Sequence, residues 1–200
     1  MKGQLFVISA PSGTGKSTVL GEVRARLTGL GYSVSHTTRR PRPGEQEGRD
    51  YFFVDKETFK RMAEEGSFVE WARVYGDYYG TSFFSLEGQL DSGVDVLLDL
   101  DVQGARSIKE HFKESVLIFL VPPSLEVLED RLRNRGTDGQ EVIETRLKKA
   151  RKEIAEFNRY HYVIINDELE QAVEEVQAII LSERSRTGRR APIVKELFGL

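Results

Sequence analysis

A glycine-rich stretch near the start of the chain has the composition of a phosphate-binding loop. It runs from Ala10 to Ser17 with the sequence APSGTGKS. Gly13 and Gly15 allow backbone N–H groups to turn toward an anion, because neither has a Cβ in the way. Lys16 has the reach to contact the β- and γ-phosphates of a nucleotide, and the Ser17 hydroxyl is a ligand for Mg²⁺. The spacing therefore predicts a site for a nucleoside triphosphate and its Mg²⁺ ion.

The sequence on either side of this loop supports that interpretation. Residues 5–8 form a short apolar run typical of a buried strand, and helical spacing of apolar residues begins after Ser17. Ala10 stands where the first glycine of such a loop usually lies, and alanine fits there if its φ is negative. The alternative is a glycine turn with a solvated lysine. The residues expected to bind ATP here are Ala10, Pro11, Ser12, Gly13, Thr14, Gly15, Lys16, Ser17 and Thr18.

A carboxylate follows a later apolar run. Asp99 ends the predicted strand 94–99, and ligands of parallel α/β sheets bind beyond the carboxyl ends of the strands. An aspartate in that position can hold Mg²⁺ through a water molecule. Asp101 points to the same side if the strand continues. Such an aspartate is otherwise a strand-end cap, but its proximity to a phosphate loop favours the metal role.

Arginines are concentrated in two segments that lie outside the predicted core strands. The first segment contains Arg39, Arg40 and Arg42, and the second contains Arg131, Arg135 and Arg146. Arginine binds phosphate bidentately, and one well-placed arginine can be worth ~10³–10⁵ in the rate of phosphoryl transfer. We therefore expect Arg131 and Arg135 to bind ATP. The alternatives are a solvated surface or, for the first cluster, a nucleic-acid contact.

The rest of the chain predicts a parallel α/β core. Apolar runs at residues 94–99, 116–120 and 162–165 alternate with amphipathic helices. The predicted units are a core of 1–34, 87–123 and 150–183, an inserted α+β subdomain at 35–86, a charged helical pair at 124–149, and a tail at 184–200. Inserted segments make few core contacts, so we expect these two to move.

Composition excludes several kinds of protein. The apolar fraction of 39% and the charged fraction of 30% are those of an ordinary globular protein, and no apolar run approaches the ~20 residues that span a bilayer. Without cysteine, there is no disulfide and no thiolate metal site. The three histidines, at 36, 111 and 161, are too scattered to indicate a metal site. The net charge of −3 is unlike that of a nucleic-acid binder. We expect a cytoplasmic protein without membrane or nucleic-acid partners.

The tail combines basic and apolar residues. It carries Arg184, Arg186, Arg189 and Arg190, followed by the apolar segment 193–198. One interpretation is a solvated linker that ends in a short docked helix. The other is self-association through the apolar end, because such ends often bury themselves against a partner.

Several motifs together resemble the bacterial-type guanylate kinase family. They cover nearly the whole chain, from about Leu5 to Glu183. In addition to the phosphate loop they are residues 35–39 (SHTTR), 41–45 (PRPGE), 50–53 (DYFF), 78–81 (YYGT), 99–104 (DLDVQG), 135–136 (RG) and 166–167 (ND).

The resemblance implies a P-loop NTPase-type core, a GMP-binding insert and a helical lid. It implies transfer of the γ-phosphoryl group of ATP to GMP, and also to dGMP, with Mg²⁺ as cofactor. The GMP-binding residues implied are Ser35, Arg39, Arg42, Tyr51, Glu70, Tyr79, Thr81 and Asp101. Asn166 is expected near the adenine of ATP. Catalysis is then alignment and charge neutralisation by Lys16, Arg39, Arg135 and Arg146.

The chemistry of guanine agrees with this assignment. Guanine presents N1–H and N2–H₂ donors side by side, which suit a carboxylate such as Glu70, whereas adenine has a bare acceptor at N1. Viewed alone, Glu70 is a surface carboxylate, and Tyr51 and Tyr79 are core aromatics. Two rival functions share the fold: a scaffold module that binds phosphopeptides, and a kinase for another phosphate ester such as a ribose bisphosphate.

Overall fold

The computed structural model describes residues 2–31, 33–74, 76–134 and 139–200. Its core is a parallel sheet with the strand order β2-β7-β1-β8-β9. The strands are β1 (Leu5–Ser9), β2 (Leu30–Gly31), β7 (Asp95–Asp99), β8 (Val116–Val121) and β9 (Tyr162–Ile165). The predicted parallel α/β core is confirmed; β7 begins one residue later than expected.

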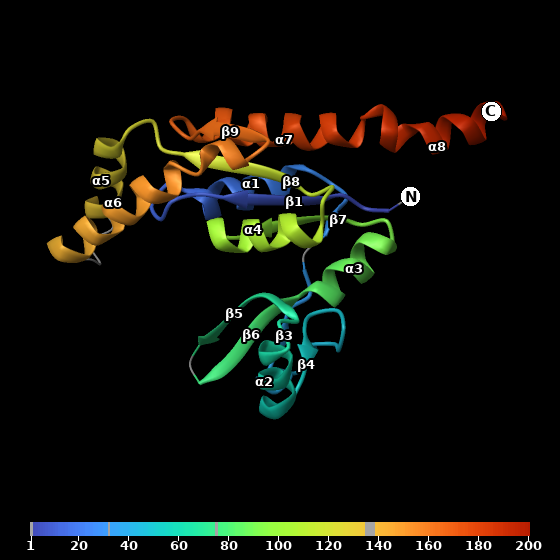
Figure 1. Cartoon of the computed structure of the whole chain (residues 1–200), viewed down its shortest axis with the longest axis horizontal. Helices are drawn as coiled ribbons and strands as arrows, with labels where there is room; N and C mark the ends of the chain where they lie inside the picture. Colours follow the sequence, from blue (N-terminus) through green and yellow to red (C-terminus); the bar gives the residue numbers. More distant parts are fainter. Residues whose placement is uncertain (1, 32, 75, 135–138) are drawn as a thin grey trace.

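Helices cover both faces of this sheet (Figure 1). Alternate residues of β1 point to opposite faces, as the pleat of a strand requires. Phe6 and Ile8 pack with α1 (Lys16–Arg26) and α7 (Leu169–Arg184), and Leu5 and Val7 pack on the side of α3 (Phe83–Asp91) and α4 (Val102–His111). All four of these β1 side chains are buried. Both faces of the central strand are therefore apolar, which explains its continuous apolar sequence.

A smaller lobe lies below the core in Figure 1. Its mixed sheet has the order β4-β3-β6-β5, with β3 (His36–Thr37), β4 (Phe52–Phe53), β5 (Phe68–Val74), β6 (Asp77–Ser82) and the helix α2 (Lys56–Glu64). Phe59 of α2 is buried, and its ring stacks on those of Phe68 and Tyr78 at centroid distances of 4.5 and 5.3 Å. This aromatic cluster is the lobe's own small core.

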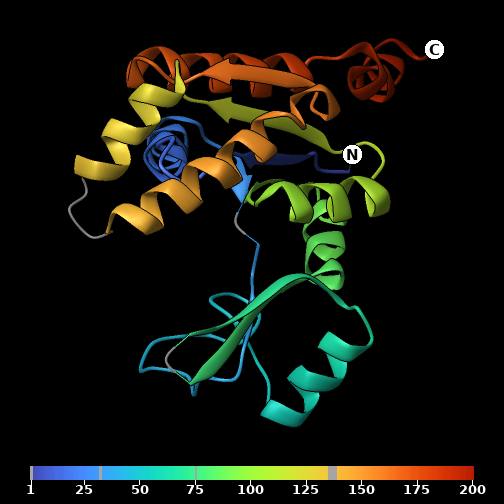
Figure 2. The same cartoon turned by 60° about the vertical axis from the view of Figure 1, so that its left-hand side comes forward.

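A helical pair flanks the core beside α1 (Figure 2). It consists of α5 (Leu125–Asn134) and α6 (Gln140–Ile154), and the short 3-10 helix η1 (Phe157–Arg159) follows. Ser124 caps the start of α5. Its hydroxyl accepts the backbone N–H of Val127 at 3.2 Å, the hydrogen bond that makes serine favourable at this position. Leu128 and Leu132 are fully buried on the inner face of α5.

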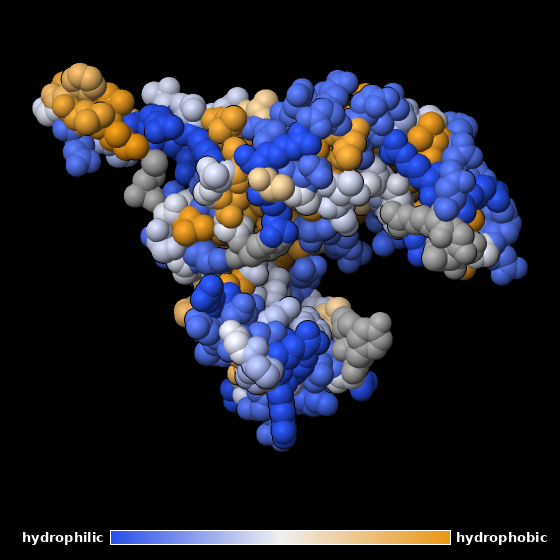
Figure 3. Space-filling view, turned by 180° about the vertical axis from the view of Figure 1, so that it is seen from behind, coloured by the Kyte–Doolittle hydropathy of each residue, from blue (hydrophilic) through white to orange (hydrophobic). Residues whose placement is uncertain are grey.

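The tail differs from the expectation of a solvated linker and a docked helix. After α7, the helix α8 (Thr187–Phe198) extends beyond the core, and none of its residues is buried. The first turn of α8 contacts the core through Arg189, but the apolar end of the helix is not docked on the core as the prediction required. Apolar side chains at its end remain exposed, Leu197 and Phe198 among them, and Figure 3 shows this apolar end.

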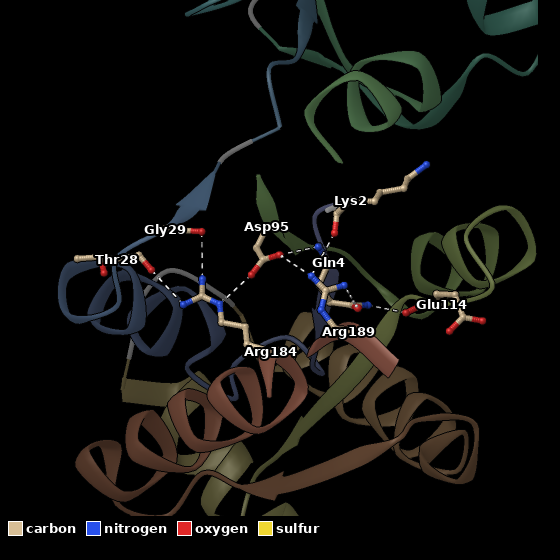
Figure 4. Close-up of polar contacts among 8 residues, drawn as sticks. All are labelled: Lys2, Gln4, Thr28, Gly29, Asp95, Glu114, Arg184 and Arg189. Carbon is tan, nitrogen blue, oxygen red and sulfur yellow. Dashed lines mark hydrogen bonds and ion pairs between the residues drawn. The ribbon is translucent and has the colours of Figure 1, made fainter. Parts of the chain in front are cut away.

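The base of the tail is fastened to the sheet by charge rather than by apolar packing. Buried Asp95 pairs with Arg184 at 2.7 Å and with Arg189 at 3.5 Å, and it accepts the backbone N–H of Gln4 at 2.6 Å (Figure 4). Arg184 also donates to the backbone carbonyls of Thr28 and Gly29. These two arginines are thus not solvated, and they act at the amino end of β7, the end of the strand opposite Asp99.

Candidate functional site

The phosphate loop joins the carboxyl end of β1 to the start of α1. Gly13 and Gly15 both have φ of 97°, a conformation that side chains rarely adopt, and Gly15 is the N-cap of α1. The first N–H groups of a helix have no partners within the helix, and the helix dipole places partial positive charge there. The loop residues therefore form a turn at a helix start whose N–H groups and partial charge suit an anion.

This turn is supported from behind by the helical pair and by the segment after β9. A Cβ on Gly13 would lie 2.8 Å from Cδ2 of Leu132 on α5. Asn166 and Arg131 both donate hydrogen bonds to the Thr14 carbonyl, at 2.6 and 3.3 Å. The structure therefore places these two predicted ATP-binding residues against the loop backbone.

A cavity of about 290 Å³ opens in front of the loop. Lys16 lines it, forms an ion pair with Asp99 and donates to the Leu100 carbonyl at 3.0 Å. Two residues of α6 that the sequence did not indicate, Lys149 and Glu153, also line it. Their helix is distant in the chain, and no local motif marks them.

Of the two predicted catalytic arginines in the helical pair, the structure describes Arg146. Arg146 lies on α6 and donates to the Ser12 hydroxyl at 3.2 Å, so the structure brings it to the loop. Arg135 lies outside the described residues.

A second cavity, of about 320 Å³, lies between the core and the lobe, where the molecule is hollowed (Figure 3). Ser35, Glu70 and Thr81 line it, and the hydroxyls of Ser35 and Thr81 lie 3.4 Å apart. Ser17 lines both this cavity and the one in front of the loop, and Asp99 lines the second. The two cavities therefore meet at the phosphate loop.

Glu70 faces this second cavity in an unfavourable electrostatic environment. The Glu70 side chain is exposed to solvent, but the cavity walls partly desolvate its carboxyl and raise its pKa. The like charges of Asp99 and Asp101 add to the rise, while Lys16 opposes it. A partly desolvated carboxylate is stabilised when a ligand supplies hydrogen-bond donors. Arg24 and Ser33 also line the cavity. No sequence motif marks either of these two residues.

A cluster on the lobe holds most of the residues predicted to bind the acceptor phosphate. The Arg39 guanidinium lies 5.4 Å from the centre of the Tyr51 ring, and the rings of Tyr51 and Tyr79 are 6.1 Å apart. Arg39 pairs with both carboxylate oxygens of Glu45, at 2.7 and 3.0 Å. The Arg42 backbone N–H donates to Glu45, and the Arg42 side chain is exposed. Glu45 belongs to the PRPGE motif, but the sequence assigned it no role.

Asp101 lines a different cavity from Ser35, Glu70 and Thr81, although its charge still acts on Glu70. It is the N-cap of α4, and its carboxylate accepts the backbone N–H groups of Gln103 and Gly104 at 3.0 and 2.9 Å. It lines the cavity in front of the loop and not the one that holds Glu70.

Within the described ranges, no cluster of three or more His, Cys, Asp and Glu side chains could hold a metal ion. The donors available at the loop are the Ser17 hydroxyl and the Asp99 carboxylate, hard oxygen ligands of the kind that Mg²⁺ prefers. Mg²⁺ commonly takes only one or two ligands from the protein and the rest from phosphates and water. The donor set fits such an ion. In the part of the chain that the structure describes, no helix combines the length and apolar character needed to cross a bilayer.

A phosphate loop on a parallel sheet, joined to a second polar cavity at Ser17, defines a P-loop kinase that acts on a small acceptor. The family model of guanylate kinase matches residues 2–183. The chain therefore belongs to the guanylate kinase family, whose reaction is the transfer of the γ-phosphoryl group of ATP to GMP.

Individual guanylate kinases align with all or nearly all of the chain. The chain is 47% identical over 199 residues to a guanylate kinase of Geobacter sulfurreducens, a match that covers 100% of this chain and 98% of the relative. It is 50% identical over 192 residues to a guanylate kinase of Desulfotalea psychrophila, covering 96% and 94%. It is also similar to the crystal structure of guanylate kinase from Anaplasma phagocytophilum, with a TM-score of 0.66 at 35% identity, over 100% of this chain and 97% of that one.

Proposed function

We propose that this chain is an ATP:GMP phosphotransferase that converts GMP, and also dGMP, to the diphosphate at the junction of its two cavities. The observation that carries the proposal is that Ser17 of the phosphate loop also lines the cavity of Ser35, Glu70 and Thr81. A donor on the loop and an acceptor in the second cavity would therefore meet beside Lys16.

The acceptor base is selected by the second cavity. The Glu70 carboxylate would accept N1–H and N2–H₂ of guanine, and the Ser35 and Thr81 hydroxyls complete a polar wall. Sites that hydrogen-bond a substrate in this way reject an analogue lacking the donors by ~10⁴–10⁵, because the buried group is left unpaired. Bound guanine would also relieve the unfavourable environment that raises the pKa of Glu70.

The acceptor phosphate would be held by the lobe. Arg39, Arg42, Tyr51 and Tyr79 supply guanidinium and hydroxyl donors, and Asp101 would meet the edge of the base. Because Arg39 is paired with Glu45 in this structure, GMP would compete with or join that pair. We assign residues 35–86 to GMP binding and 124–149 to a lid.

The donor phosphates would be held by residues 10–18, with Asn166 and Arg131 beside them. Lys16, Arg39, Arg135 and Arg146 would neutralise charge on the transferred group. Ser17, and Asp99 through water, would hold Mg²⁺, which would supply further charge neutralisation when bound. The acceptor is already an anionic oxygen, so little general-base work is needed.

We also propose a cytoplasmic location, because ATP and GMP are available there, and self-association through the exposed apolar end of α8. No nucleic-acid or membrane partner is proposed. Sedimentation of the full chain is compared with that of a form that stops at Pro192, which keeps Arg184 and Arg189 but lacks the apolar end of α8. The same number of protomers per particle in both forms would contradict self-association through α8.

A coupled assay of ADP release tests the proposed reaction. GMP, dGMP, AMP, UMP, dTMP and a ribose bisphosphate are compared as acceptors at equal concentration with ATP and Mg²⁺. Turnover confined to the two guanine nucleotides supports the proposal. Comparable turnover with AMP or with the ribose bisphosphate would contradict the assignment of Glu70 as the base-selecting group.

A further inference from the structure

The carbonyl oxygen of Thr14 accepts two side-chain donors from outside the phosphate loop. It accepts Nδ2 of Asn166 at 2.6 Å and Nη1 of Arg131 at 3.3 Å. A carbonyl oxygen has two lone pairs, so these two donors satisfy it. Asn166 is only 5% exposed, so its amide is held within the protein and not on the surface.

Asn166 is itself held rigidly. Its backbone N–H donates to the carbonyl of Val121 at the end of β8, at 2.8 Å. Its own carbonyl accepts Nη1 of Arg131 at 3.0 Å, and Arg131 also reaches the Asp167 carbonyl at 3.4 Å. The amide is therefore fixed to the central sheet and to α5 at the same time.

The loop is shaped to admit this amide. A Cβ on Gly15 would lie 2.8 Å from Nδ2 of Asn166, closer than real Cβ contacts come. Gly15 also has φ of 97°. A glycine at this position thus permits both the turn and the close approach of Asn166 from behind.

The hydrogen bond to Thr14 determines the direction of a neighbouring donor. The Thr14 carbonyl and the Gly15 N–H belong to one peptide group, which is trans and planar, so the two dipoles point in opposite directions. Holding the carbonyl against Asn166 and Arg131 turns the Gly15 N–H to the other side, and Gly15 lines the cavity in front of the loop. The amide behind the loop therefore aims an N–H group in front of it.

We propose that Asn166 is a positioning residue that, together with Arg131, orients the peptide between Thr14 and Gly15 toward the donor phosphates. The proposal rests on the ATP-binding role of the loop. It assigns to the Nδ2 donor of Asn166 a contribution to polyphosphate binding that does not depend on the base.

The test uses a ligand that has phosphates and no base. Binding of inorganic tripolyphosphate with Mg²⁺, and separately of ATP with Mg²⁺, is measured by calorimetry for the wild type, Asn166→Ala and Asn166→Leu. Asn166→Leu keeps a similar side-chain size, removes the donor and adds no charge. Asn158→Ala, at an exposed asparagine of η1, is the matched control.

Both Asn166 variants are expected to lose about 10-fold or more in affinity for tripolyphosphate and for ATP alike, as the loss of one oriented donor implies. Loss of ATP affinity with unchanged tripolyphosphate affinity would overturn the proposal and favour contact with adenine. Unchanged affinity for both ligands in Asn166→Leu would overturn it as well.

Binding of GMP to the same variants separates this proposal from the proposed function. Retained GMP affinity shows that the variants are folded and that the acceptor site is intact, so a loss on the phosphate side belongs to the loop. Failure of the wild type to bind GMP or ATP would instead contradict the proposed function.

Discussion

The phosphate loop and the acceptor lobe are stabilised in opposite ways. The loop is held from outside itself: Leu132 packs under Gly13, and Asn166 and Arg131 hold the Thr14 carbonyl. The lobe instead satisfies its charged groups internally, since Arg39 pairs with Glu45 six residues away. The loop is therefore organised before a ligand arrives, whereas the lobe has a counter-charge that a ligand must replace or share.

This difference agrees with the ligand that we propose for each region. Backbone N–H groups cannot rotate independently, so a phosphate cradle needs a rigid backbone fixed by packing. Selection of a base needs a side chain whose ionised form is poorly solvated until the ligand donates to it. Glu70, with its raised pKa, has that property.

The largest effect is expected at the loop itself. Lys16→Met should lower turnover by at least ~10²–10³-fold, because the ammonium that neutralises the donor phosphates is lost. The coupled assay measures turnover, and thermal unfolding checks the fold. Lys148→Met, at an exposed lysine of α6, is the matched control. Near-normal turnover in Lys16→Met would remove the loop from the chemistry.

Glu70→Gln should break the selectivity of the acceptor cavity. We expect GMP affinity to fall by about 10- to 100-fold, because a hydrogen bond to a charged group contributes ~1.5–3 kcal/mol. ATP affinity should change little, because Glu70 would contact only the acceptor. Separate binding titrations of the two nucleotides measure this. Equal losses for both ligands would mean that Glu70 supports the whole site and not the base.

Glu70→Gln should also change how the stability of the protein depends on pH. A carboxyl whose pKa is raised above 4.5 in the folded protein destabilises the fold as pH rises from about 4.5 through the raised value. Glu70→Gln removes this loss, so the ligand-free variant should be at least as stable as the wild type at pH 7. A variant that is less stable than the wild type there would show that the carboxylate stabilises the empty cavity.

Gly13→Ala should damage the loop through its packing. The new Cβ would meet Leu132 at 2.8 Å and Leu128 at 3.0 Å, at a φ of 97°. We expect a loss of about 1–3 kcal/mol in stability together with weaker ATP binding. Gly66→Ala has a positive φ but nothing within 4 Å, so it isolates the backbone strain. Equal destabilisation by the two substitutions would show that support by α5 contributes nothing.

The smallest effect is expected at Glu45. Its pKa is lowered, first by the hydrogen bond from Arg39 and then by the Arg42 backbone N–H. A lowered carboxyl pKa contributes stability above the unfolded value of 4.5, and this is lost as pH falls through the folded value. Glu45→Gln should therefore narrow the stability difference between pH 7 and pH 3, with less than a tenfold change in the KM for GMP. Unfolding curves at the two pH values measure the first effect, and an unaltered pH dependence would contradict it.

Much of the core could be predicted from the sequence because its signals are local. The apolar runs of β1, β8 and β9 and the glycines of the loop each determine their own conformation. The support behind the loop could not be predicted in this way. Asn166 meets Thr14 across 152 positions, and only the folded sheet brings them together.

The tail and the acceptor lobe show the same limit. The sequence suggested that Arg184 and Arg189 are solvated. In the fold, both pair with Asp95, which lies some 90 positions earlier in the chain. Arg24 of α1 and Ser33, which precedes β3, line the proposed acceptor cavity, and no sequence motif marks either residue. Resemblance to a family identified most candidate residues, but the contacts that orient them required the three-dimensional structure.

The most direct test of the account is a crystal structure of the protein with a non-hydrolysable ATP analogue, Mg²⁺ and GMP. The account predicts the β- and γ-phosphates on the N–H groups between Gly13 and Ser17 with Lys16 in contact, and guanine against Glu70. A nucleotide bound elsewhere, or a loop whose N–H groups point into the core while phosphate occupies another site, would contradict it.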